Sequence, residues 1–323
     1  MLMAPVAIAI AATSSGIAQT RHHLNPVIDL LDQGKQVFGV YWPTNAMGRR
    51  GAPPPPDAPV KTPAELAKDA LAYEFSDFLF SGSMEGGVER GLPAFVDFAK
   101  ATQDAGALRK SPFPHLPHPL IVKTSKISEA TPEQTVSYIS RQLNVGASGI
   151  MFVEAESADE VRRGINAMRF KANGGTRQEG VGAAPAYWGM SEGEYKKKAD
   201  LWPLNKDGEL INWTIVESKE GLAHVREIAA VKGIGVLWPG AGTLRGVFST
   251  TNEKGERVLD QAGWENAIQT VLAACKEFKV PCGFPANAND IEMRMKQGFS
   301  VFVMNWGDAG FKTVEIGRKT AGR

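Results

Sequence analysis

The chain has 323 residues, with 36 Lys and Arg against 35 Asp and Glu, so its formal net charge is only +1 at pH 7. This balance, without a basic block or an acidic tail, argues against nucleic-acid binding and against a disordered acidic segment, and it leaves small molecules as the expected partners. The length suits one α/β barrel or two smaller domains.

The chain begins with an uncharged apolar stretch, residues 1–12, and small residues follow it as far as Ala18. The pattern is typical of a secretory signal peptide, although a basic start is missing, and it is shorter than the roughly 20 apolar residues of a membrane span. We therefore expect cleavage after residues 1–18 and a periplasmic or secreted protein without a membrane anchor. The alternative is a cytoplasmic protein in which this stretch forms a barrel strand.

Short apolar runs alternate with charge-bearing helical patterns along the rest of the chain. The apolar runs predict strands at 37–42, 78–81, 120–124, 149–153, 213–216, 235–237, 282–284 and 301–304. The helical patterns lie at 63–73, 92–105, 132–144, 158–168, 191–199, 219–231, 263–278 and 288–297. Eight strands with eight helices predict one domain over residues 25–323, a single parallel (β/α)8 TIM-type barrel, with an open doubly wound sheet as the alternative.

Two helix starts carry capping residues, Thr131 before one helical pattern and Asn289–Asp290 before another. Two proline-rich segments, 49–59 and 111–119, lack the N–H donors of a central strand and predict extended loops. The first follows a strand and belongs at the carboxyl end of the barrel, whereas the second precedes a strand and belongs at the opposite face.

The histidines that suggest a metal site are interpreted as structural. His115 and His118 form a His-x-x-His pattern, but they lie in the second proline-rich loop, so we predict that both are surface residues. His22 and His23 precede the domain, and we expect them near the mature terminus.

The two cysteines are seven residues apart. Cys275 falls on an apolar helical face and Cys282 starts the next strand. Because a helix end and the following strand rarely bring their Cα atoms within disulfide range, we predict that they stay unbridged. They do not indicate a cellular compartment.

Charged residues close two of the predicted strands. Glu217 follows the apolar run 213–216, and Lys123 follows the apolar residues 120–122 near the end of its predicted strand. The carboxyl ends of parallel barrel strands meet at one mouth, where barrel enzymes carry their chemistry. We therefore predict that both side chains open into one cavity there; the alternative for Glu217 is a purely structural ion pair with Lys123 or Arg245.

Several segments resemble the HpcH/HpaI aldolase/citrate lyase family. They are Asn25 to Trp42, Val145 to Phe152 with Glu156 to Val161, and Ala186-Tyr-Trp-Gly189 with Tyr195 and Asp200, and the resemblance covers most of the chain. It implies a β/α barrel and a carbon–carbon lyase that cleaves a 2-oxo or hydroxy acid in a retro-aldol reaction. It also implies a divalent metal (Mg, Mn or Co) held by a Glu and an Asp, an Arg on the keto oxygen, and a His that an Asp orients. We expect a homo-oligomer.

The family's residues carry over only in part. Glu217 matches the metal-binding Glu, whereas the second metal position falls on Ala241, the Arg on Lys123, the His on Gly86 and its Asp on Ser83. Alanine supplies no ligand, so the metal requirement stays open. Lysine keeps the positive charge without the planar fork of arginine, and it can also act as a base or form a Schiff base. The resemblance therefore implies a lyase whose mechanism is altered.

The remaining candidates lie near the predicted strand ends. We expect Lys123 and Glu85 to be catalytic, and the substrate to contact Lys123 together with Trp42, Trp238 and Gly240. Carboxylates that would replace the lost metal ligand beside Glu217 are Glu85, Glu154, Glu156 and Asp308. The alternative function is a non-catalytic exported barrel that binds a small carboxylate or an aromatic ligand, and the metal content of the purified protein separates the two.

Overall fold

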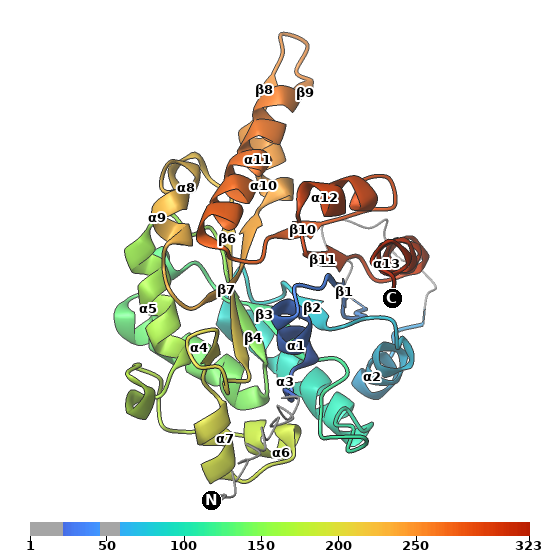
Figure 1. Cartoon of the computed structure of the whole chain (residues 1–323), viewed down its shortest axis with the longest axis vertical. Coiled ribbons are helices and arrows are strands. Elements are labelled where there is room, and N and C mark those ends of the chain that lie inside the picture. The colour runs from blue at the N-terminus through green and yellow to red at the C-terminus, as the bar shows by residue number, and fades with distance from the viewer. Residues whose placement is uncertain (1–21, 46–58) are drawn as a thin grey trace, which may run out of the picture.

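The computed structural model describes residues 22–45 and 59–323. A curled sheet of parallel strands lies at its centre, with helices around the outer side (Figure 1). The strands are β1 (Val37–Tyr41), β2 (Leu79–Ser81), β3 (Leu120–Lys123), β4 (Gly149–Phe152), β5 (Leu201–Trp202), β6 (Leu210–Val216), β7 (Ile234–Pro239), β8 (Ser249–Thr251), β9 (Arg257–Leu259), β10 (Gly283–Pro285) and β11 (Val301–Met304). The predicted leader, residues 1–18, lies outside the described residues.

Helices connect the strands. They are α1 (Pro26–Asp32), α2 (Pro63–Ala72), α3 (Val88–Asp104), α4 (Pro132–Val145), α5 (Ala158–Met168), α6 (Ala184–Trp188), α7 (Glu192–Lys198), α8 (Lys219–Ala223), α9 (Val225–Ala229), α10 (Ala241–Val247), α11 (Gln261–Phe278), α12 (Ile291–Gln297) and α13 (Asp308–Thr320). All the predicted helices are present, although the one expected at 219–231 is divided into α8 and α9. The chain pattern missed α1, α6, α10 and α13. None of the described helices has the length and apolar character that crossing a bilayer requires.

The sheet places chain neighbours side by side. Its strands follow the order β10-β11-β1-β2-β3-β4-β6-β7, all parallel, and the two-residue β5 also pairs with β6. Between β7 and β10 there is one parallel bridge, Leu237 with Cys282, and the Leu237 N–H donates to the Pro281 carbonyl at 2.9 Å. The structure thus confirms a parallel α/β arrangement of the eight predicted strands, with a single bridge where the curled sheet meets itself. Separately, β8 and β9 form an antiparallel hairpin that protrudes from the body (Figure 1).

The strands alternate between an inner and an outer face. Side chains on the inner face form one apolar cluster, which includes Phe80, Ile121, Trp213 and Trp238, and α1 contributes to the same cluster. The intervening side chains pack outward against the helices. Because successive strand residues point to opposite faces, Lys123 lies on the same face as Ile121, at the carboxyl end of β3.

One of the two predicted caps is confirmed. The Thr131 side chain accepts from the Gln134 N–H, and Gln134 returns the bond to the Thr131 N–H, which is a complete capping box at the start of α4. At α12 the prediction is wrong in detail, because Asp290 stands at the N-cap without capping the helix. Its carboxylate instead accepts the backbone N–H of Asn287 in the preceding turn.

The prediction for the cysteines is wrong, since Cys275 and Cys282 form a disulfide with Cα atoms 5.7 Å apart. The reason lies in the end of α11. Lys279 adopts a left-handed conformation with φ 56°, and the Val280 N–H then donates to the Cys275 carbonyl at 2.9 Å. This tight reversal brings the start of the next strand back alongside the last helical turn.

Removing the disulfide is expected to loosen the join between β7 and β10. Cys282 forms the bridge to Leu237, so in the Cys275→Ser, Cys282→Ser variant we expect unfolding to cost about 2 kcal/mol less and Tm to fall by about 4 °C. Hydrogen exchange should also show faster exchange of the Leu237 amide. A reduced wild-type protein that melts like the oxidised one, with unchanged Leu237 protection, would contradict this role.

Candidate functional site

Three charged side chains lie at the carboxyl ends of strands in the same part of the sheet. Lys123 ends β3, Glu85 follows β2, and Glu217 follows β6. The Lys123 ammonium forms an ion pair with Glu85, with 2.8 Å between Nζ and Oε1. The Lys123 side chain is 12% exposed and the Glu85 side chain 41%, so the pair lies at the edge of the interior and is reached from solvent on the Glu85 side.

Glu217 lies deeper than this pair, with only 3% of its surface exposed. Its Oε1 accepts the backbone N–H of Glu154 at 3.2 Å. Burial raises the pKa of the Glu217 carboxyl above its usual range, although the nearby charge of Lys123 and a hydrogen bond from Thr243 act in the opposite direction. A carboxyl group that holds its proton more firmly than usual beside a lysine is suited to proton transfer.

A second set of charges flanks Glu217. The Lys126 ammonium lies 3.2 Å from a carboxylate oxygen of Glu154 and 3.1 Å from one of Glu156. Glu154 also has a left-handed backbone, with φ 46°, which is unusual for a residue with a side chain. Glu154 therefore contributes its N–H to Glu217, while its carboxylate is paired with Lys126.

Gly240 follows β7 and packs directly on Glu217. A Cβ atom at Gly240 would lie 2.2 Å from the Glu217 Cβ and 2.5 Å from its Oε2, so only glycine leaves the carboxylate in place. The Gly240 N–H donates to the Val216 carbonyl at 2.9 Å, which fixes the close approach. The predicted contact between Gly240 and a substrate stays a prediction.

The two tryptophans predicted to contact the substrate lie on different faces. Trp42 packs on the outer face, with its ring 4.6 Å from Phe98 of α3 and 8% of its surface exposed. Its place is therefore in the layer between β1 and α3, on the face opposite to Lys123. Trp238 lies on the inner face, 5.1 Å from the ring of Trp213 and only 2% exposed.

Tyr41, which the sequence pattern did not single out, is the aromatic residue of β1 that faces inward. It packs against the inner cluster and meets the ring of Phe80 edge-on at 5.0 Å. Strict alternation along β1 was the signal that would have distinguished it from Trp42.

Of the two positions that the resemblance assigns to metal ligands, only Glu217 carries a donor atom. Ala241 begins α10 beside Gly240 and offers no ligand atom. Within residues 22–45 and 59–323, no group of three or more His, Cys, Asp or Glu side chains is arranged to hold a metal ion. Among the described residues, the cation whose charge acts on Glu217 is the Lys123 ammonium. A divalent cation bound by Glu217 would have to complete its coordination with water or substrate oxygens.

The histidine predictions need correction. His118 is not on the surface but 5% exposed, and burial, together with the charge of Arg109, lowers its pKa to about 4. His23 is also buried, with its Nδ1 3.4 Å from a Glu209 carboxylate oxygen. His115 is half-buried. The surrounding chain folds over these residues, which a proline-rich sequence alone does not reveal.

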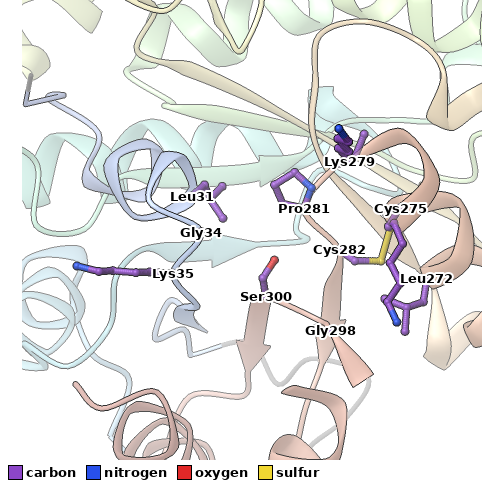
Figure 2. Close-up of a pocket in the computed structure, with 12 residues that line it drawn as sticks. Leu31, Gly34, Lys35, Leu272, Cys275, Lys279, Pro281, Cys282, Gly298 and Ser300 are labelled. Atoms are coloured by element: carbon purple, nitrogen blue, oxygen red, sulfur yellow. A yellow bond between two sulfur atoms is a disulfide. The ribbon is translucent and has the colours of Figure 1, made fainter. Parts of the chain in front are cut away.

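A pocket of about 250 Å³ lies at the other end of the strands (Figure 2). Residues that precede strands line it, among them Lys35, Pro281 and Ser300, and the Cys275–Cys282 disulfide forms one wall. Lys123 and Glu217 do not line it. In Figure 2 the Lys35 side chain extends away from the other lining residues, so the lysines here do not converge on one point.

The chain was compared with protein families, with curated proteins and with solved structures, and the matching structures agree on its fold. No protein-family model matches the chain. Over 188 residues the chain is 28% identical to a protein described as hydroxypyruvate/pyruvate aldolase from Paraburkholderia phytofirmans, and the match covers 56% of this chain and 61% of that protein's length. The chain therefore spans less than two thirds of this relative.

Solved structures match over nearly the whole chain. An HpcH/HpaI aldolase/citrate lyase family protein from Burkholderia cenocepacia superposes with a TM-score of 0.63 at 20% identity, covering 92% of this chain and 98% of that one. An HpcH/HpaI aldolase from Desulfitobacterium hafniense has a TM-score of 0.58 at 15% identity, covering 91% and 95%. At this identity the match establishes the fold.

Proposed function

The structural neighbours of this chain are HpcH/HpaI aldolase/citrate lyase family proteins, and from that premise we propose that it is a carbon–carbon lyase acting on a small 2-oxo or hydroxy acid. The observation that carries the proposal is the Lys123–Glu85 ion pair beside the buried Glu217, at the strand ends where barrel enzymes react their substrates. The name of the 28% identical relative, a hydroxypyruvate/pyruvate aldolase, supports a 2-oxo acid as substrate or product.

The three side chains divide the retro-aldol steps among them. The Glu85 carboxylate takes the proton of the substrate's 4-hydroxyl group, the bond between C3 and C4 breaks, and an aldehyde leaves. The electron pair moves to form an enolate on the 2-oxo fragment, whose oxygen the Lys123 ammonium stabilises. Glu217, whose pKa burial raises, gives a proton to C3 and completes the 2-oxo acid, and passage of the proton held by Glu85 to Glu217 restores both groups for the next turnover.

We propose that this reaction does not need a bound divalent metal. The second metal position is Ala241, and the charge beside Glu217 is supplied by Lys123, so no step is assigned to a metal. The purified protein is expected to contain no stoichiometric Mg, Mn or Co, and EDTA should leave its activity unchanged. Stoichiometric metal together with inactivation by EDTA would overturn this part of the proposal and assign the metal to Glu217.

The proposed function is tested with a panel of 4-hydroxy-2-oxo acids, in which pyruvate release is followed by a coupled reduction to lactate. Release of pyruvate and an aldehyde in equal amounts is the expected result. A folded protein that releases neither product from any member would favour the alternative, a non-catalytic barrel that binds a small carboxylate or an aromatic ligand.

We also propose a closed (β/α)8 barrel, a homo-oligomer and export to the periplasm or medium after cleavage near residue 18. The single Leu237–Cys282 bridge supports closure, and the apolar start of the chain supports export. Mass spectrometry of protein from its native host tests the proposed export. An intact N-terminus would contradict cleavage and favour a cytoplasmic protein.

A further inference from the structure

Tyr41 stands beside the Lys123–Glu85 ion pair, although neither the sequence pattern nor the proposed chemistry uses it. It is the last residue of β1 and pairs in register with Phe80 of β2. Its side chain is half-buried on the inner face, and the ring is held edge-on to the Phe80 ring at 87°. The ring is therefore fixed in position by packing rather than by a polar contact.

Gly82 marks the point at which Tyr41 and the ion pair come together. A Cβ atom at Gly82 would lie 3.6 Å from Lys123 Cδ, 3.7 Å from Glu85 Oε2 and 4.0 Å from Tyr41 Cε1. Three side chains from three different strand ends thus surround one glycine. Because glycine has no side chain, room about the size of one methyl group is left among them.

The Tyr41 hydroxyl has no hydrogen-bond partner among residues 22–45 and 59–323. The hydroxyl oxygen is not among the buried polar atoms that lack a partner, so it is open to water at this edge of the sheet. A water-accessible hydroxyl on a ring that lies near a lysine and a carboxylate can exchange its bond to water for a bond to a ligand oxygen.

We propose that Tyr41 is a substrate-binding residue whose hydroxyl donates a hydrogen bond to an oxygen of a small 2-oxo carboxylate seated over Gly82. The ammonium of Lys123 and the hydroxyl of Tyr41 then approach the ligand from two sides. The inference rests on the proposed function for the class of ligand, but binding can be measured without turnover.

The test uses pyruvate as the probe and compares the wild-type protein with Tyr41→Phe by calorimetry. The expected result is a dissociation constant roughly tenfold higher in the variant, the effect of losing one hydrogen bond to a charged group. Tyr138→Phe, which removes a phenol hydroxyl from a half-buried position on α4, is the matched control and should bind pyruvate like the wild type. Gly82→Ala fills the space at ordinary contact distances and should also weaken binding in a folded protein.

The outcomes separate the two proposals. Pyruvate binding that depends on Tyr41 without any cleavage would refute the lyase and support the binding residue. Equal binding, or an equal kcat/KM, in Tyr41→Phe and wild type would overturn the role of Tyr41 while the lyase stands. A wild-type protein that does not bind pyruvate at about 1 mM would overturn the inference as well.

Discussion

Replacing Lys123 with methionine is expected to lower kcat/KM for retro-aldol cleavage by at least about 100-fold, the usual cost of removing a group that stabilises a developing oxyanion. The ammonium is the cationic group that forms an ion pair with Glu85 and whose charge acts on Glu217, so no neighbouring side chain of the described site replaces it. Methionine keeps the length of the side chain, and circular dichroism and Tm should show a folded protein.

Lys126→Met is the matched control for this experiment. Lys126 lies at the same end of the sheet and is also mostly buried, at 18% exposed, but it pairs with Glu154 and Glu156 rather than with Glu85. Its loss should change kcat/KM by less than about fivefold, in line with a group that only flanks the reacting atoms. A comparable loss of kcat/KM in both variants would show that activity depends on the total positive charge at this end of the sheet rather than on the Lys123 ammonium.

Lys123→Arg distinguishes the two chemical roles of the lysine. Arginine keeps the charge but cannot form a Schiff base, so measurable activity in this variant supports a role for charge. An inactive arginine variant, together with a wild-type protein that borohydride traps covalently on pyruvate, would assign a Schiff base to Lys123 instead.

Replacing Glu217 with glutamine is expected to lower kcat by about 100-fold and, at the same time, to stabilise the protein at neutral pH. Burial raises the pKa of Glu217 in the folded chain above its unfolded value. The folded state therefore binds more protons than the unfolded state between the two pKa values, and stability falls as pH rises through that window. Above it, the wild type carries the cost of a buried charge that the glutamine variant avoids.

The measurement is urea unfolding of both proteins between pH 4 and pH 8. The two free energies of unfolding should be close near pH 4 and should differ increasingly as the pH rises, with the variant the more stable protein at pH 7. A variant that is less stable than the wild type at pH 7 would show that Glu217 serves as a stabilising ion-pair partner.

Glu209→Gln provides the contrast. Glu209 is equally buried, but its carboxylate accepts the Asn25 N–H at 3.1 Å and lies 3.4 Å from His23. Glu209 precedes β6, so these structural contacts lie at the amino end of the strand, away from Glu217. This variant should lose stability at neutral pH and keep its activity. Opposite stability changes at two buried glutamates would identify Glu217 as a residue retained for function at a cost to stability.

The sequence by itself determined where the strands are and which of them end in charge. Short apolar runs predicted eight of the nine strands of the main sheet, all except the two-residue β5, since hydrophobic patterning is a local property of the chain. Because parallel strands present their carboxyl ends at one edge, the positions of Lys123 and Glu217 at strand ends predict that both side chains face one cavity there. In the structure the charge of Lys123 acts on the buried Glu217.

Tertiary structure decided the details on which the chemistry depends. The start and direction of β1 determine that Tyr41 faces inward and Trp42 outward. A shift of β1 by one residue in its pairing register would reverse the faces of these two side chains. The left-handed turn at Lys279 brings Cys275 to Cys282.

The same holds for burial and charge. His118 is buried because other parts of the chain fold over its loop, and Glu217 is surrounded by Gly240, Lys123 and the N–H of Glu154, which come from three separate segments. Residue type and spacing record what a segment prefers locally. Burial, pairing and the direction of a pKa shift are set by groups distant in the chain, so only the folded molecule decides them.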